Sequence, residues 1–230
     1  MACDLTFDLE TATGGTALAL SPDRLIVAGW TGRDRDAMLE HIRELEALGI
    51  PRPASTPIFY RVAASRLTQA PAIQVPGGGS SGEAEVLLLQ AEGRLLVGLG
   101  SDHTDREAER QGITLAKQLC DKPLARGLWP FEEVQPHWDR LELRSWIEEE
   151  GGERLYQEGT LAAMLPPEEL LAGLQAVEAP LADRSLLFCG TLPALGGVRP
   201  APAFRCRLSD PVLARRIELS YRIETLPDRG

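Results

Sequence analysis

The chain has 230 residues, which is enough to bury one sizeable core, and we expect a single domain. Its formal net charge of −10 at pH 7 argues against nucleic acid or an anionic membrane as the main partner. No run approaches the roughly 20 apolar residues that a membrane helix needs, and the four cysteines form no C-x-x-C pair. We therefore expect a cytoplasmic protein that takes a small-molecule substrate.

Short apolar runs separated by turn residues predict a mixed α+β fold that is rich in strands. We expect helices at 34–49, 105–119 and 166–177, and a loop at 121–137. The expected strands lie within 3–20 around a Thr-Gly-Gly turn, and at 24–30, 58–62, 86–89, 94–99, 141–147, 154–157 and 185–191, with two more in AFRCRL and RIELSYRIETL.

Three carboxylates bound the two apolar runs between residues 82 and 107. Glu83 and Glu85 are two positions apart, so they share one face of an extended chain. A three-residue loop at 91–93 would return the chain so that Asp102 lies beside Gly82 and Glu83. Strict alternation then points Asp102 to the opposite face, so a break at Gly100 is needed to turn it inward. A hard divalent cation such as Mg²⁺ would relieve the repulsion between the three acids.

The alternative interpretation is an exposed hairpin with solvated acids, because a lone E-x-E pattern is common. The near-continuous apolar runs VLLLQ and LLVGLG argue against it, since acids beside buried strands need partners. Only Lys117 and Lys122 among the 24 basic residues are lysines. Two interpretations are open: chance placement on the surface, or two positions that require a compact ammonium.

Two further patterns carry candidate chemistry. His41 and Glu44 share a face of the helix expected at 34–49, which suits a base oriented by a carboxylate but also an ordinary surface ion pair. A G-x-S-x-G stretch places Ser80 at its centre, yet the sequence predicts a strand rather than a helix after it, which disfavours a serine hydrolase. His103 and His137 lack ligand-like spacing and are expected to be structural or hydrogen-bonding residues.

The order of these pieces resembles the fumarylacetoacetate hydrolase superfamily from Leu25 to the C-terminus. The corresponding stretches are LIVAGW, H-x-x-E at 41–44, PRPASTP, F-x-R at 59–61, E-x-E at 83–85, SDHTDRE at 101–107, Lys117, LELRSWIEEEGGERLYQEG, PPEELLAGL and Gly190-Thr191-Leu192. Three motifs depart from the family pattern: Trp30-Thr31 replaces N-Y, Arg61 replaces the lysine of F-x-K, and Leu192 replaces the proline of G-T-P.

The resemblance implies a β-roll with flanking short helices, and one catalytic domain over 1–230. Residues 1–60 would supply N-terminal strands and the helix with positions 41 and 44, and 61–230 the β-roll core. It also implies Mg²⁺ or Mn²⁺ as cofactor and a homodimer. The implied site residues are Glu83, Glu85 and Asp102 for the metal, His41, Glu44 and Lys117 for catalysis, and Arg61, Gln157, Gly190 and Thr191 for the substrate.

The implied reaction is hydrolytic or lyase cleavage of a C–C bond in a small 2-oxo acid or 1,3-diketo acid through a metal-stabilised enolate. Isomerases, decarboxylases and dehydratases of similar oxo acids are alternatives, because they use the same enolate-stabilising core. A catalytically silent fold that binds a small acid or another protein is a further alternative. The sequence does not choose among them.

Overall fold

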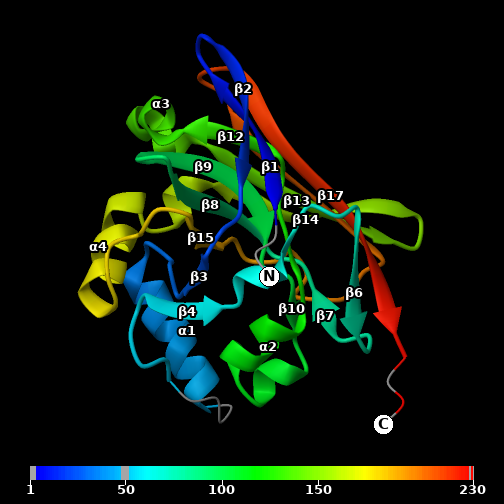
Figure 1. Cartoon of the computed structure of the whole chain (residues 1–230). Coiled ribbons are helices and arrows are strands. Elements are labelled where there is room, and N and C mark those ends of the chain that lie inside the picture. The colour runs from blue at the N-terminus through cyan, green and yellow to red at the C-terminus, as the bar shows by residue number, and fades with distance from the viewer. Residues whose placement is uncertain (1–3, 48–51, 228, 230) are drawn as a thin grey trace.

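The computed structural model describes residues 4–47, 52–227 and 229, except for the side chains of His41, Glu44, Leu45 and Ala47. Strands build an eight-stranded sheet in the order β2-β1-β12-β9-β8-β15-β3-β4. Its strands are β1 Leu5–Thr11, β2 Gly14–Leu20, β3 Arg24–Gly29, β4 Ile58–Val62, β8 Ala84–Ala91, β9 Arg94–Ser101, β12 Gly127–Pro130 and β15 Ser185–Thr191. Figure 1 shows the β1–β2 hairpin at one end of the molecule.

A second sheet of five strands has the order β14-β13-β16-β17-β6. Its strands are β6 Ala72–Pro76, β13 Glu142–Glu149, β14 Gly152–Thr160, β16 Ala203–Asp210 and β17 Arg215–Leu226. Two short pairs complete the strands: β5 Leu67–Thr68 with β11 Lys122–Pro123, and β7 Ser80–Ser81 with β10 Thr104–Asp105.

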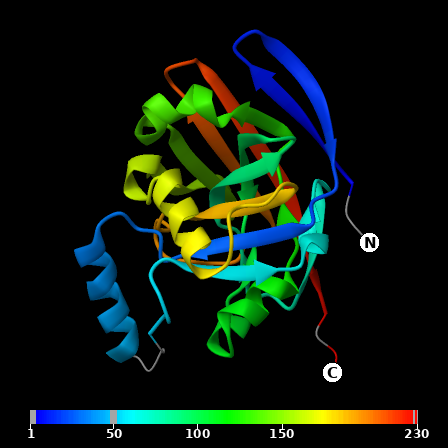
Figure 2. The same cartoon turned by 60° about the vertical axis from the view of Figure 1, so that its left-hand side comes forward.

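The helices are short and lie outside the sheets. They are α1 Arg35–Ala47, α2 Ile113–Leu119, α3 Phe131–Val134 and α4 Pro167–Val177, with 3-10 turns at Ala64–Arg66, Ala108–Arg110, Gln135–Arg140 and Leu161–Ala163. Both views place α1 and α2 at the end of the molecule opposite the β1–β2 hairpin, and Figure 2 shows α1 standing at the side of the body. Among the described residues, no helix combines the length and apolar character needed to cross a bilayer.

The apolar core has two parts, one on each face of the large sheet. Val86 and Leu88 of β8 belong to the cluster shared with the five-stranded sheet and α4, whereas Leu87 and Leu89 belong to the cluster under β1. Both faces of β8 are therefore buried, which explains its unbroken apolar sequence. The mixed, strand-rich architecture confirms the predicted fold class.

The turn between β8 and β9 differs from the predicted three-residue loop. Ala91 pairs with Arg94, so only Glu92 and Gly93 form the loop, and both have positive φ, 52° and 74°. Such a two-residue turn matches the twist of the strands it joins. The register places Ala84 opposite Ser101.

This register also removes the need for the predicted break at Gly100, because β9 runs through Gly100 to Ser101. One step beyond that pair, the amide of Asp102 donates to the carbonyl of Glu83 at 3.0 Å. Residues opposite each other on antiparallel strands point to the same face. The regular pleat therefore aligns all three acids by itself.

Two other segments differ from their predictions. The helix expected at 105–119 is divided at Gly112 into a 3-10 turn and α2, because glycine is a poor helix former. The expected loop at 121–137 contains β11, β12 and α3. The helix predicted at 34–49 is present as α1 up to Ala47, and its last two positions lie outside the described residues.

Candidate functional site

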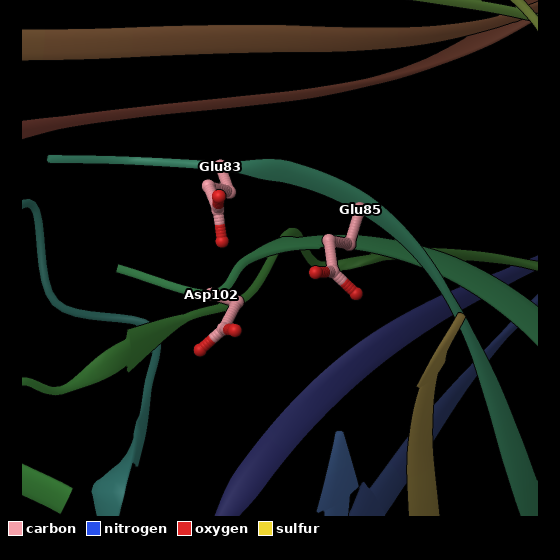
Figure 3. Close-up of side chains that lie close together, drawn as sticks. All are labelled: Glu83, Glu85 and Asp102. Carbon is pink, nitrogen blue, oxygen red and sulfur yellow. The ribbon is translucent and has the colours of Figure 1, made fainter. Parts of the chain in front are cut away.

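The three predicted carboxylates meet at one point. Glu83 and Glu85 extend from the start of β8 and Asp102 from the end of β9 (Figure 3). One oxygen from each carboxylate lies within 4.8 Å of the other two. Glu85 is 2% exposed and Asp102 is fully buried, while Glu83 is partly exposed. The interpretation as solvated surface acids is therefore wrong for this hairpin.

Both lysines of the chain contact Asp102. Lys117 of α2 donates to its Oδ2 atom, and Lys122 of β11 lies 2.9 Å from its Oδ1 atom. Lys122 also donates to the backbone carbonyl of His103. Both lysines are buried, so neither is a chance surface residue.

The charges around Asp102 set the protonation of the cluster. Burial alone would raise the pKa of Asp102, but Lys117 and Lys122 outweigh it and hold that pKa well below its usual range. Burial lowers the pKa of Lys117, but the surrounding carboxylates, Asp102 first, raise it above its usual value. The Asp102 carboxylate and the Lys117 ammonium are therefore both charged at neutral pH.

Glu85 has no such lysine partner. Burial raises the pKa of its carboxyl group well above the usual range, and the negative charges of Asp102 and Glu83 raise it further. Its Oε2 atom accepts a hydrogen bond of 2.8 Å from the amide of Gly190. Of Glu85 and Asp102, Glu85 is the one that more readily holds a proton.

Arg106 supplies the third cation beside the acids. Its Nη2 atom lies 3.0 Å from Glu83 Oε1, and its Nη1 atom donates to Glu109 at 3.0 Å. Its Nε atom donates to Ser81 Oγ at 2.7 Å. The ion pair with Glu83 lacks hydrogen-bond geometry, so Nη2 is a buried donor that no described acceptor satisfies. A buried donor of this kind suits an anionic oxygen of a bound ligand.

Glu83 and Glu85 line a cavity of about 520 Å³, a volume typical of sites for small molecules. The charged residues of its lining are Asp34, Glu83, Glu85, Arg106, Glu109 and Lys117. The remaining walls are mostly apolar and aromatic and include Trp30, Met38, Tyr60, Ile113, Tyr156, Leu192, Pro193, Ala194 and Val198.

Three of the predicted substrate residues line the floor of this cavity: Gln157, Gly190 and Thr191. The Gln157 amide is fully bonded within the protein. Its oxygen accepts from Ala84 N at 3.0 Å and Ser145 Oγ at 2.7 Å, and its nitrogen donates to Thr191 Oγ1 at 2.7 Å and the Leu192 carbonyl at 2.6 Å. Gln157 therefore fastens β8 to the end of β15.

The other predicted residues are placed differently. The structure does not bring Arg61 into the cavity, because its half-exposed guanidinium pairs with Glu178 at 3.1 Å. The side chains of His41 and Glu44 lie outside the described part of the chain. The helix that carries these positions does border the cavity, through Ala37 and Met38.

Ser80 and the two other histidines are hydrogen-bonded residues, as predicted for the histidines. His103 Nε2 lies 2.9 Å from Ser80 Oγ, and His103 Nδ1 lies 3.0 Å from Tyr221 Oη. Burial and the charge of Lys122 lower the pKa of His103 to about 3, so its ring is neutral. Ser80 is buried and is followed by a strand, not by the helix of a nucleophile elbow. His137 bonds Asp210 at 2.9 Å.

Sequence reasoning assigned no role to Arg106 or Glu109, and for Lys122 it proposed only that a compact ammonium could be required there. The scarcity of lysine was a usable signal for Lys122, because it singled out the two lysines that meet at Asp102. For Arg106 and Glu109 the sequence offered only their place in the stretch after Asp102.

Glu85→Gln is expected to stabilise the ion-free protein. Because the pKa of Glu85 is higher in the folded protein than its ordinary value of 4.5, folding favours the protonated carboxyl. The wild-type protein therefore loses stability as pH rises from 4.5 through the folded-state pKa. A neutral amide avoids this loss and can still accept from Gly190. In thermal unfolding with a chelator, the gain over wild type should widen as pH rises above 4.5.

The partly exposed Glu83 provides the matched control, as Glu83→Gln. Glu83→Gln should give no gain in stability, because Glu83 is partly exposed and pairs with Arg106. A Glu85→Gln gain that shrinks with rising pH contradicts the argument from burial.

The chain is similar to one described protein family and to several solved structures. Residues 28–221 match the family model described as a protein of unknown function, DUF2848. No curated protein matches the chain. Several solved structures do, at low identity.

A yeast fumarylacetoacetate hydrolase family protein is 18% identical with a TM-score of 0.64, covering 90% of this chain and 95% of its own. A protein provisionally described as a fumarylacetoacetate isomerase/hydrolase from Oleispira antarctica is 19% identical, with a TM-score of 0.64 and coverage of 94% and 98%. A 2-keto-3-deoxyarabinonate dehydratase is 15% identical, with a TM-score of 0.64 and coverage of 90% and 74%. This protein therefore has the fumarylacetoacetate hydrolase fold, and it belongs to the DUF2848 family of unknown function.

Proposed function

We propose that this protein is a divalent-metal-dependent enzyme that acts on a small oxo acid. The observation that carries the proposal is the meeting of three carboxylates with Lys117 and Arg106 at one wall of a 520 Å³ cavity. Acids and bases gathered in a partly apolar cavity of this size are the usual signature of an active site. The fold of the neighbours described as hydrolases and a dehydratase agrees with it.

The residues present suit Mg²⁺ or Mn²⁺. Glu83, Glu85 and Asp102 offer three hard oxygen donors within 4.8 Å of one another, and no sulfur or imidazole ligand that would favour a softer ion joins them in the described residues. A divalent ion held there would polarise neighbouring substrate oxygens and stabilise negative charge on them.

The chain's own residues would bind and orient the substrate. Arg106 Nη2 is available for a carboxylate oxygen, and the Lys117 ammonium can offset negative charge as it develops on an enolate oxygen. Gln157 would act indirectly, because its four hydrogen bonds hold Thr191 and the start of β8 in place. The apolar walls would accommodate the rest of the substrate and exclude water.

His41 and Glu44 remain the proposed base and its orienting partner. Their support is the H-x-x-E spacing, together with the position of α1 at the cavity rim. In the proposed reaction, His41 takes a proton from water, whose oxygen adds to a ketone carbon. The bond from that carbon to its neighbour then breaks. The attacked carbon leaves as a carboxylic acid, and the other fragment leaves as an enolate that accepts a proton and becomes a shorter ketone or oxo acid.

C–C hydrolysis is the reaction we favour, and decarboxylation, isomerisation or dehydration of a similar oxo acid are the runner-up reactions. The dehydratase among the structural neighbours is the observation that keeps the second group open. A panel of 2-oxo and 1,3-diketo acids with Mg²⁺ or Mn²⁺, followed for pyruvate, CO₂ and enol formation, separates them. If no acid turns over, or if His41→Ala leaves turnover unchanged, the catalytically silent alternative is favoured.

The metal itself is tested by titration calorimetry. Mg²⁺ or Mn²⁺ should bind wild type, and binding should be lost in Glu83→Ala/Glu85→Ala because two of three ligands are gone. Glu132→Ala/Glu148→Ala removes two exposed acids elsewhere and is the matched control for net charge. Equal binding by wild type and the site variant would refute the metal proposal.

We further propose a homodimer in the reducing cytoplasm. The dimer is proposed from the family resemblance, and the compartment from the buried free thiols of Cys120, Cys189 and Cys206. Light scattering at micromolar concentration should give twice the mass of one 25.0 kDa chain. A monomer under those conditions contradicts the dimer.

A further inference from the structure

The only two lysines of the chain converge on one carboxylate. Lys117 occupies Asp102 Oδ2 and Lys122 lies 2.9 Å from Oδ1, so each oxygen of Asp102 already has an ammonium partner. Every other basic residue apart from the histidines is arginine. An ammonium is compact, whereas the planar guanidinium fork demands more room, so these two positions select lysine.

Four acids, Glu83, Glu85, Asp102 and Glu109, lie beside three cations, Arg106, Lys117 and Lys122, and both oxygens of Asp102 are already paired. A divalent ion that takes an oxygen of Asp102 must therefore displace a cation from it. Two positive charges at ion-pair distance from the same oxygen repel strongly in a buried setting.

The two lysines differ in how easily they can leave. Lys122 is fully buried, donates a second hydrogen bond to the His103 carbonyl and does not border the cavity. Lys117 borders the cavity and retains slight exposure, and its ammonium lies 5.7 Å from the centre of the Tyr60 ring. Only Lys117 has open space and an alternative partner beside it, since a cation is attracted to an aromatic face.

We propose that the two lysines divide their work: Lys122 is a resident counter-charge for Asp102, and Lys117 is an exchangeable one that turns into the cavity when a divalent ion takes Asp102 Oδ2. This rests on the proposed function only in requiring that a divalent ion binds the three acids. Ion binding thereby delivers a free ammonium to the substrate side of the site. Lys117 would then contact substrate only in the ion-loaded protein.

The scarcity of lysine makes the exchange directly observable. Protein labelled with ¹⁵N only in lysine has two side-chain ammonium signals in the whole chain, and Lys117→Met assigns them by removing one. Without ions, both ammonium groups should be protected from exchange with water. On addition of Mg²⁺, Lys117 should exchange about tenfold faster or more, and Lys122 should keep its protection.

A second measurement uses calorimetry on Lys117→Met. Removing the competing ammonium should tighten Mg²⁺ binding about tenfold or more, which corresponds to roughly 1.4 kcal/mol. Lys117 borders the cavity, so methionine there should be tolerated by the fold. Unchanged or weaker Mg²⁺ binding by a folded Lys117→Met protein overturns the exchange.

The outcomes separate the two proposals. If calorimetry detects Mg²⁺ binding to wild type but the Lys117 signal stays protected, or the Lys122 signal is the one that exchanges, the division of labour is wrong while the metal site stands. If Mg²⁺ does not bind at all, the metal-dependent function and the exchange fail together. In Glu83→Gln/Glu85→Gln, neither lysine signal should respond to Mg²⁺.

Discussion

Asp102→Asn is expected to destabilise the ion-free protein by roughly 3 to 5 kcal/mol, because it leaves two buried ammonium groups facing a neutral amide. The carboxylate of Asp102 is the ion-pair partner of both Lys117 and Lys122, and none of the three is open to solvent by more than a small fraction. Chemical denaturation with a chelator present measures the free energy of unfolding.

Two further variants sharpen this test. Glu83→Gln removes a partly exposed acid whose partner Arg106 keeps Glu109, so it should cost about 1 kcal/mol or less. Asp102→Asn/Lys122→Met removes one stranded charge and should be less destabilised than the two single changes added together. A single Asp102→Asn variant within about 1 kcal/mol of wild type would show that the lysines do not depend on this carboxylate.

Gly190→Ala is expected to cost roughly 3 kcal/mol or more, by two separate effects. Gly190 has a φ of +98°, which strains any other residue, and an added Cβ would lie 1.8 Å from Thr31 Oγ1. The backbone shift that relieves this overlap also moves the Gly190 amide away from Glu85 Oε2. Denaturation measures the loss of stability, and calorimetry should show weaker Mg²⁺ binding.

The chain provides controls that separate the two effects. Gly93 has a φ of +74° but no atom within 4 Å of an added Cβ, so Gly93→Ala should cost only the strain of about 1 kcal/mol. Adding Thr31→Ala to Gly190→Ala removes the nearest atom and should restore part of the stability. If Gly93→Ala and Gly190→Ala lower the free energy of unfolding equally, the close approach to Thr31 is not what requires glycine at position 190.

The acid cluster was predictable because its causes are local. The two-residue spacing of Glu83 and Glu85 fixes their common face, and the apolar runs behind them indicate a buried hairpin. The position of Asp102 was predicted for the wrong reason. Counting Ala91 into the loop shifted the register by one position, and that shift created an apparent need for a break at Gly100.

The parts that sequence reasoning missed depend on contacts between distant segments. β12 has only four residues and is followed directly by α3, and its burial comes from pairing with β1 and β9. Lys122 pairs with Asp102 and Arg106 with Glu83, and both acids lie in distant segments of the chain, so only the folded chain shows these pairings. Arg61 follows the family order, yet it pairs with Glu178, the residue that directly follows α4. The spacing of residues in the sequence does not predict this pairing.

Because β8 is buried on both faces, we expect its backbone to change little when the proposed ion binds or leaves. Glu85 lies on a strand that is hydrogen-bonded on both sides and covered above and below, so its backbone should be among the slowest in the chain to exchange amide protons. The backbone that carries Glu85 should therefore keep its position whether or not an ion is bound. Removal of the ion should leave β8 folded and change mainly the side chains around it.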